Sequence, residues 1–276
     1  MKNVTPADGI VIRELATHDE RASAVRLQEE TWGAGFTERV PAAILLVGQK
    51  LGGVSAGAFA RDGTLLGFVF GLTGTKDGQL VHWSDMLAVR RDAQGRHLGQ
   101  ALKHYQRERC IAIGVETMYW TFDPFVARNA KLNLCRLGAR VDEFVPDMYG
   151  TNTNSRMHGA LGTDRFIASW PVRREPVPLP SDANRLRGAV VVAGRAGDSP
   201  ATNAPLPDAP LPDAPSVVVR VPADYLALLA GDLEIARAWR MSARRAFLHY
   251  FPLGYRVVAF AADGERDAAY LLSRSA

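Results

Sequence analysis

The chain has 276 residues, of which 47% are hydrophobic, so it can bury a core in one large domain or two smaller ones. Its net charge of +4 is mild, and the basic residues form no run of the kind that binds nucleic acid. It has no apolar stretch of signal-peptide or membrane-span length, and its two cysteines, Cys110 and Cys135, fit reduced thiols better than a disulfide framework. We therefore expect a cytoplasmic protein without nucleic-acid or membrane partners.

Four elements are expected before residue 75, from apolar spacing and turn residues. They are a strand over 10–13, a helix from Asp19, a helix from Pro41 to Leu51, and a hairpin of strands over 54–60 and 65–72 joined by Arg61-Asp62-Gly63. Proline suits the first turn of a helix because the N–H that it lacks would be unpaired there.

Residues 80–89 predict a strand that runs directly into the glycine- and arginine-rich turn 94–99, which opens an amphipathic helix ending near Gly114. The first N–H groups of a helix have no partner inside it and carry the positive end of its dipole. The turn therefore predicts an anion site suited to phosphate. A strand over 117–122 and a helix over 127–137 follow.

The turn resembles the acyl-CoA turn of the GNAT superfamily, whose pattern is Gln or Arg, two residues, Gly, one residue, then Gly or Ala. Here it reads Gln94, Gly95, Arg96, His97, Leu98, Gly99, with His97 in place of the middle glycine. The order of strand, phosphate turn, helix, strand and helix ending in Leu137-Gly138 is also that of GNAT enzymes. The resemblance covers roughly residues 10 to 170, and it implies an α/β (α+β) fold with a mixed, mostly antiparallel sheet flanked by helices.

Acetyl-CoA or another acyl-CoA is the co-substrate that the resemblance implies. In GNAT enzymes the fourth and fifth strands part, and the pantetheine adds hydrogen bonds to the fourth strand, here at Leu87 and Val89. The N–H of Leu87 would also stabilise the oxyanion of the attacked thioester. The expected cofactor contacts are Leu87, Ala88, Val89, Gln94, Gly95, Arg96, His97, Leu98, Gly99, Gln100 and Asn129.

Amine attack on a thioester needs a base, because an alkylamine is protonated near neutral pH. Asp85 lies two residues before Leu87, on the same side of the strand as Leu87 and Trp83, and is the candidate base. The alternative for Asp85 is a cap or an ion pair with a neighbouring arginine. His82 faces the other way and is expected in the core, unless a bulge re-aims it.

Other candidate site residues lie further along the chain. Relatives carry a tyrosine that protonates the thiolate, but Leu134 stands at its place, so Tyr149 is the candidate substitute, with simple packing as the alternative. Arg165 is a candidate for holding a substrate carboxylate, against an ion pair with Asp164 or Glu143. Trp83 is expected beside the substrate. Asn129 and Asn133, one helical turn apart, are expected on one face.

Six basic residues cluster around the turn and its helix. Arg90, Arg91 and Arg96 are expected near phosphate, whereas Lys103, Arg107 and Arg109 suit either phosphate or a solvated helix face. The histidines show no partners at metal-ligand spacing, so no metal is expected.

Composition changes after Trp170. Nine of the sixteen prolines fall between Pro176 and Pro215, which predicts a linker over 173–215, with a short strand near 190–192. A GNAT domain over 1–172 therefore precedes a small subdomain over 216–276. This subdomain is expected to contain a strand over 217–221, a helix with the stripe Ala236, Trp239, Arg240, Ala243, Phe247 and Tyr250, and a hairpin around Asp263-Gly264, and to pack on the core or on a second subunit.

The sequence thus favours an N-acyltransferase that moves acetyl, succinyl or a similar small acyl group from CoA to a primary amine, with an amino acid among the candidate acceptors. The alternative is a non-catalytic acyl-CoA-binding module. A monomer and a homodimer both stay open.

Overall fold

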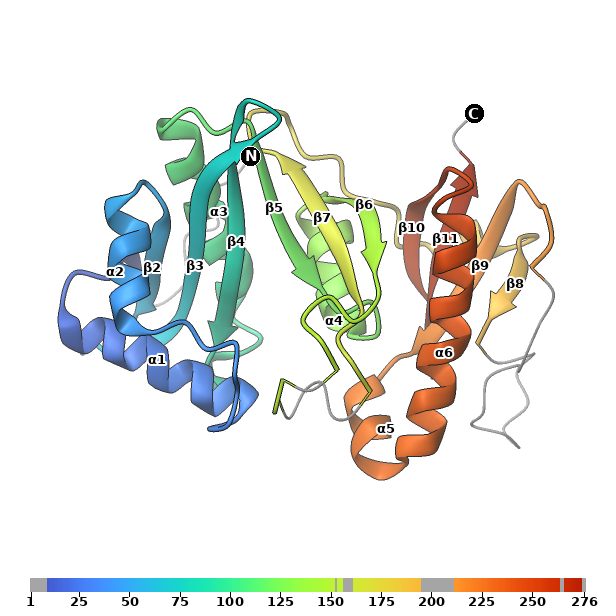
Figure 1. Cartoon of the computed structure of the whole chain (residues 1–276), viewed down its shortest axis with the longest axis horizontal. Coiled ribbons are helices and arrows are strands. Elements are labelled where there is room, and N and C mark those ends of the chain that lie inside the picture. Colours follow the sequence, from blue (N-terminus) through green and yellow to red (C-terminus); the bar gives the residue numbers. More distant parts are fainter. Residues whose placement is uncertain (1–8, 152, 156–160, 195–210, 264–265, 275–276) are drawn as a thin grey trace. The chain divides into compact units, whose positions relative to one another are not determined.

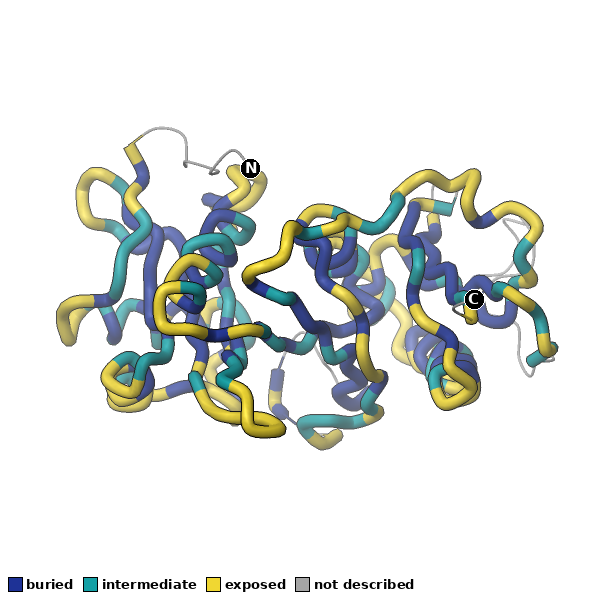
Figure 2. The backbone as a smooth tube through the Cα atoms, turned by 90° about the horizontal axis from the view of Figure 1, so that it is seen from above, coloured by how far each residue is buried: buried dark blue, intermediate teal, exposed yellow. Residues whose placement is uncertain are grey.

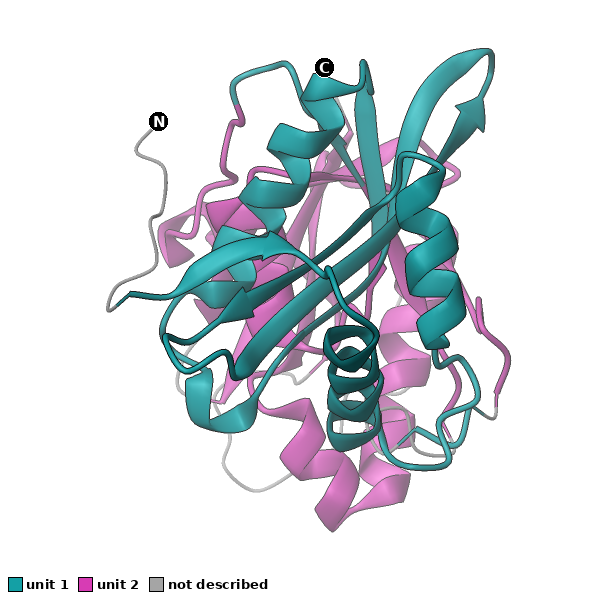
Figure 3. Ribbon diagram, turned by 90° about the vertical axis from the view of Figure 1, so that its left-hand side faces the viewer, with its two compact units in different colours: residues 1–120, 153–157, 169–175 teal, residues 121–152, 158–168, 176–276 magenta. Residues whose placement is uncertain are grey.

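The computed structural model describes residues 9–151, 153–155, 161–194, 211–263 and 266–274. It divides into two compact units (Figure 3). The first comprises residues 1–120, 153–157 and 169–175, and the second comprises residues 121–152, 158–168 and 176–276. The second unit therefore combines residues from the region of the GNAT resemblance with the C-terminal residues.

The larger sheet has seven strands in the order β1-β2-β3-β4-β5-β7-β6 (Figure 1). Their bounds are β1 Val11–Glu14, β2 Val54–Phe59, β3 Leu65–Lys76, β4 Gln79–Val89, β5 Thr117–Phe122, β6 Arg140–Val145 and β7 Arg165–Pro171. The pairs from β1 to β4 are antiparallel, and β4 pairs with β5 in parallel. This mixed sheet with its helices confirms the predicted fold class.

Three helices of the first unit begin where the sequence predicts. They are α1 (His18–Trp32), α2 (Ala42–Lys50) and α3 (Leu98–Ala112). Thr17 and Glu20 form a capping box at the start of α1, and Pro41 is the N-cap of α2. Ala24 and Leu27 of α1 share one buried cluster with the aromatic residues of β3, so the apolar face of α1 covers the sheet.

The helix predicted over 127–137 is present, but its winding changes. α4 (Ala127–Ala130) continues into the π-helix η2 (Lys131–Arg136), where the N–H of Leu137 donates to the carbonyl of Leu132. A π turn is wider than an α turn. Asn133 is buried and Asn129 is half-buried, so the two side chains differ in their exposure to solvent.

A second, four-stranded sheet has the order β10-β11-β9-β8. Its strands are β8 Val190–Ala193, β9 Ser216–Pro222, β10 Tyr255–Asp263 and β11 Asp267–Arg274, and its helices are α5 Tyr225–Gly231 and α6 Leu233–Tyr250. All six residues of the predicted helical stripe are buried on α6. Figure 2 colours each residue by its burial, and buried and exposed residues alternate along the backbone.

The predicted linker over 173–215 contains two regular elements, the short helix η3 (Ala183–Leu186) and the strand β8. Residues 195–210 of the linker lie outside the described residues.

Aromatic packing joins the C-terminal elements to Pro124 and Phe166 within the second unit. The ring of Phe166 on β7 lies 4.8 Å from that of Phe247 on α6 and 5.4 Å from that of Tyr270 on β11. The hydroxyl of Tyr270 donates to the carbonyl of Pro124 at 2.6 Å. The C-terminal residues thus share an aromatic core with Phe166 of β7.

A bulge in β4 limits which residues fit beside it on β3. The register of the two strands shifts between Phe70 and Gly71, and a Cβ at Gly71 would meet the His82 ring and lie 2.6 Å from the carbonyl of Trp83. We predict that Gly71→Ala lowers the free energy of unfolding by about 1–3 kcal/mol, because backbone atoms cannot move aside cheaply. Gly74→Ala, in open space on the same strand, should be nearly neutral. Urea unfolding of the two variants tests this, and equal stabilities would contradict it.

Candidate functional site

The edge of β4 that faces away from β3 carries backbone N–H groups that, beyond Trp83, have no strand partner among the described residues. The N–H of Arg90 donates to Leu66 of β3 at 2.8 Å, and in an antiparallel pair such donors alternate along the strand. The N–H groups of Leu87 and Val89 therefore point away from β3. Among the described residues, the ladder from β4 to β5 involves only Val81, His82 and Trp83. Beyond Trp83, β4 presents a free strand edge, which can accept an extended ligand as an added strand.

The turn after β4 leads these backbone groups into a helix N-terminus. It contains η1 (Arg91–Ala93), followed by Gly95 at φ 81° and His97 at φ 58°. Both residues are in the left-handed region, which favours glycine and explains why the family pattern has glycine where this chain has His97. The side chain of His97 makes no capping hydrogen bond to α3. The first N–H groups of α3, on Leu98, Gly99 and Gln100, thus remain available for an anion.

The side chain of Gln94 ties the turn to the strand. Its amide donates to the carbonyl of Val89 at 3.3 Å, which fits a Val89 whose backbone groups face away from β3. Ala88 lies buried between Leu87 and Val89, which are both half-buried. The free edge of β4 and the start of α3 are therefore held together by one side chain.

The basic residues around the turn differ in their partners and in their exposure to solvent. Arg90 forms an ion pair with Asp92 at 2.6 Å, while Arg91 and Arg96 are exposed. Further along α3, Arg107 donates to the carbonyl of Arg174 at 3.1 Å, and Arg109 pairs with Glu14 at 3.0 Å. Of the two alternatives for Lys103, the solvated helix face is wrong, because its side chain is buried.

Asp85 is the extra residue of the β4 bulge. The register pairs Phe70 with Met86 and Gly71 with Ser84, which leaves Asp85 between them. Its side chain is open to solvent, while Trp83 and Leu87 on either side are half-buried. Neighbouring protein atoms reduce its hydration and raise its pKa above the usual value, and the negative charge of Glu38 raises the pKa further. Asp85 is thus an accessible carboxylate that holds a proton more readily than usual.

His82 is a core residue, as expected for its face of the strand. Its ring nitrogens contact the hydroxyl of Thr73 at 3.0 Å and the amide of Gln106 at 2.9 Å. Burial, and then the charge of Lys103, lower its pKa to about 3. His82 is therefore neutral near pH 7, and the bulge lies at Asp85 rather than at His82.

Lys103 was among the basic residues expected around the turn, but its burial was not predicted. Its ammonium donates to the hydroxyl of Ser84 at 2.7 Å and lies 4.0 Å from the centre of the Trp120 ring. Ser84 and Trp120 are the first residues of β4 and β5 beyond their ladder, so Lys103 contacts both strands where their pairing ends. Burial lowers its pKa to about 7. The sequence carries only a weak signal for this burial, namely that Lys103 lies on the same helix face as Gln106 and Cys110. That face of α3 is buried, whereas Tyr105 is half-buried.

Tyr149 and Arg165 lie together in the second unit. The hydroxyl of Tyr149 is 3.2 Å from that of Thr121, and the guanidinium of Arg165 lies 5.5 Å from the centre of the Tyr149 ring. Arg165 is buried and forms an ion pair with Asp123 at 3.6 Å, and it donates to the backbone carbonyl of Asp164 at 2.9 Å. An ion pair of Arg165 was expected with Asp164 or Glu143, but the carboxylate observed within ion-pair distance is that of Asp123. Leu134, at the place of the family's tyrosine, is fully buried.

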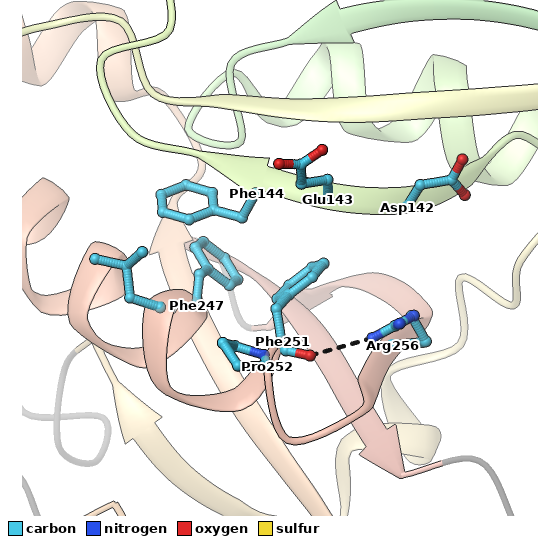
Figure 4. A pocket seen from close by; sticks show the side chains of 8 residues that line it. Asp142, Glu143, Phe144, Phe247, Phe251, Pro252 and Arg256 are labelled. Carbon is cyan, nitrogen blue, oxygen red and sulfur yellow. Dashed lines mark hydrogen bonds between the residues drawn. The ribbon is translucent and has the colours of Figure 1, made fainter. Parts of the chain in front are cut away.

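The second unit also contains a hollow that the sequence did not predict. It is lined by Asp142, Glu143, Phe144, Phe247, Leu248, Phe251, Pro252 and Arg256 (Figure 4). The Arg256 guanidinium donates to the carbonyl of Phe251 at 3.3 Å.

No group of three metal-ligating side chains occurs among the described residues of the chain. Within those same residues, no helix is long and apolar enough to cross a membrane.

Solved structures of GNAT acetyltransferases match this chain over about 60% of its length and leave a C-terminal extension. A GNAT phosphinothricin acetyltransferase from Sinorhizobium meliloti, solved with acetyl-CoA, has 15% identity and a TM-score of 0.47, over 61% of this chain and 93% of its own. An N-acetyltransferase from Staphylococcus aureus has 12% identity and a TM-score of 0.49, over 60% of this chain and 99% of its own. No family model matches the sequence, and no curated protein matches it significantly.

Lys103 makes a pH-dependent contribution to stability. Its pKa is lower in the folded chain than in the unfolded chain, so the unfolded state binds more protons between about pH 7 and the ordinary lysine value. The free energy of unfolding should therefore rise with pH across that window. We predict that Lys103→Met removes this rise and stabilises the protein at pH 7 by about 1 kcal/mol or more.

The exposed Lys50 offers a matched control. Lys50→Met should retain the wild-type rise when denaturant unfolding is followed from about pH 6.5 to about pH 10.5. A Lys103→Met protein whose stability follows the wild-type curve would show that Lys103 is charged and well solvated in the fold.

Proposed function

We propose that this chain is an acyl-CoA-dependent N-acyltransferase that moves a small acyl group to a primary amine by direct attack. The observation that carries the proposal is the free edge of β4 at Leu87 and Val89, which leads into the unsatisfied N-terminus of α3. Pantetheine carries amide groups that can pair with a strand edge, and the pyrophosphate suits the helix N-terminus. One continuous segment thus offers complementary groups to both parts of CoA.

In this proposal the contacts to CoA come from the backbone of residues 87–89 and from the turn residues Gln94 to Gln100. The side chains of Arg96 and His97, both exposed at the turn, would contribute positive charge or hydrogen bonds to the phosphates. The N–H of Leu87 would donate to the thioester oxygen as negative charge develops there.

Asp85 would take the proton of the incoming ammonium, directly or through a water molecule. Its raised pKa favours this role, because a base is most effective when its pKa approaches the working pH. Trp83 lies two residues before Asp85 and would pack beside the acceptor. The amine nitrogen then forms a bond to the acyl carbon, and the thiolate of CoA departs.

Three residues of the second unit have proposed roles. Tyr149 would protonate the departing thiolate, in place of the tyrosine absent at Leu134. Asn129, half-buried on α4, would contact the cofactor. Arg165 would bind the carboxylate of an amino-acid acceptor, because its fork of donors matches a carboxylate. Release of free CoA thiol from acetyl-CoA or succinyl-CoA with a set of amines tests the activity, and binding without turnover would favour a non-catalytic module.

The proposed phosphate site predicts that one substitution, Gln100→Glu, stabilises the helix α3 but weakens CoA binding. Gln100→Glu changes no more than the charge, and an acidic residue in the first turn stabilises a helix by about 0.3–1 kcal/mol. The same charge should repel the pyrophosphate and weaken CoA binding about fivefold or more, since unit charges in close contact repel by about 1 kcal/mol even in water. Calorimetric titration with CoA measures the affinity.

Gln79→Glu adds the same charge at the other end of β4 and should leave the affinity for CoA unchanged. If Gln100→Glu binds CoA as tightly as the wild type, the phosphates bind elsewhere.

The proposed base predicts a pH-dependent rate. Asp85→Asn keeps the size and removes the basicity, so kcat/KM should fall by about 10²-fold or more. The loss should shrink at high pH, where free amine forms without help. In the wild type the rate should fall as the pH drops through the raised pKa of Asp85, since only the carboxylate accepts a proton.

Glu38→Gln removes one cause of that raised pKa and should move the acid limb of the wild-type profile to lower pH. The measurement is kcat/KM of the wild type, Asp85→Asn and Glu38→Gln from about pH 5 to about pH 9.5. A constant ratio of wild-type to Asp85→Asn rate across this range would exclude Asp85 as the base.

A further inference from the structure

The hollow in the second unit combines an apolar lining with opposite charges at its two sides. Its volume is about 290 Å³, close to the lower limit of about 300 Å³ for ligand pockets. Asp142 and Glu143 of β6 lie at one side, and Arg256 of β10 lies at the other, beside the end of α6 (Figure 4). The hollow therefore suits a small ligand that carries both charges.

Phenylalanine rings form the apolar part of the lining. The ring centres of Phe144 and Phe247 lie 5.1 Å apart, and those of Phe247 and Phe251 lie 6.1 Å apart. Phe144 and Phe247 are buried and Phe251 is half-buried, so the rings are held by the aromatic core to which they belong. The exposed Leu248 completes this surface. An apolar group placed in the hollow would remove this surface from water.

Arg256 is held by one end of its guanidinium. Its Nη1 donates to the backbone carbonyls of Tyr255 at 2.8 Å and Phe251 at 3.3 Å. Nε and Nη2 make no hydrogen bond to any residue that the structure describes. These two donors form one edge of the planar guanidinium, which matches both oxygens of a carboxylate. Arg256 thus offers a positioned edge to a carboxylate ligand.

The opposite side of the hollow offers negative charge. The carboxylate of Glu143 is exposed and has neither a hydrogen bond nor an ion pair with another described residue. Asp142 adds negative charge beside it. Among the residues of this lining, no ion pair joins Arg256 to Glu143 across the hollow. Opposite charges that do not neutralise each other can be complemented by a ligand with its own pair of charges.

We propose that this hollow binds a free α-amino acid with an apolar side chain. The ligand carboxylate receives hydrogen bonds from Nε and Nη2 of Arg256, and the ligand ammonium contacts Glu143. The apolar side chain of the ligand packs against Phe251 and Leu248. The site uses no residue of β4 or α3, so the inference goes beyond the proposed transferase and does not depend on it.

Calorimetric titration of the full chain with L-leucine tests the site, together with three probes that each lack one feature. Leucinamide lacks the carboxylate, N-acetyl-leucine lacks the ammonium, and glycine lacks the apolar side chain. We expect L-leucine to bind about tenfold or more tightly than each of the three, because each probe loses a charge-assisted contact or the burial of apolar surface.

Two substitutions should remove different preferences. In Arg256→Met, L-leucine should bind no more tightly than leucinamide, and the affinity for leucinamide should stay at the wild-type value. In Glu143→Gln, L-leucine should lose its advantage over N-acetyl-leucine, and the affinity for N-acetyl-leucine should stay unchanged. The retained affinity for one probe in each variant distinguishes a lost contact from a lost fold.

Glu234→Gln and Arg237→Met are matched controls on α6. Both side chains are exposed, at 84% and 49%, and neither lines the hollow. They remove the same charges from the same unit and should leave all four affinities at the wild-type values.

The proposal is overturned if the wild type does not bind L-leucine, or if leucinamide or N-acetyl-leucine binds as tightly as L-leucine. It is also overturned if either Arg256→Met or Glu143→Gln binds L-leucine as tightly as the wild type, since the amino acid then binds elsewhere on the chain. These titrations contain no acyl-CoA. The release of CoA thiol, measured separately, therefore decides the proposed transferase activity independently of this site.

Discussion

The end of the ladder between β4 and β5 at Trp83 is the constraint on which the proposed site depends. Backbone N–H groups that lose their strand partner need another one, and in β4 those of Leu87 and Val89 face away from β3. Because β4 leads within ten residues to the N-terminus of α3, a second set of unsatisfied donors follows directly. An elongated ligand with amides at one end and phosphates at the other would satisfy both sets of donors.

Buried polar groups mark the place where the two strands part. Lys103 contacts Ser84 and Trp120, the first residue of each strand beyond the ladder, and His82 is held by Thr73 and Gln106 just before it. A buried ammonium without an ion-pair partner among the described residues is destabilising, which its lowered pKa expresses. The bulge on the same strand leaves Asp85 open to solvent, so neighbouring residues of β4 have opposite electrostatic surroundings.

In the second unit, charge and aromatic packing act together. Phe166 packs against Phe247 and Tyr270, which gives the C-terminal elements a common core with β7. The carboxylates and guanidinium groups beside this core, on Asp123, Asp164, Arg165, Arg240 and Arg244, are buried or partly buried and mutually paired. Removing one member of such a cluster leaves an uncompensated charge, so the partners depend strongly on one another.

The sequence by itself determined the elements whose signals are local. Apolar periodicity predicted β4, α3, β5 and the buried stripe of α6, and the turn 94–99 predicted where α3 begins, because caps, glycines and spacing act within a few residues. Pairing between distant segments was decided only by the tertiary structure. The burial of Lys103, the ion pair of Arg165 with Asp123 and the π winding near Asn133 all depend on which residues pack against them, and a single sequence carries no local signal for such long-range contacts.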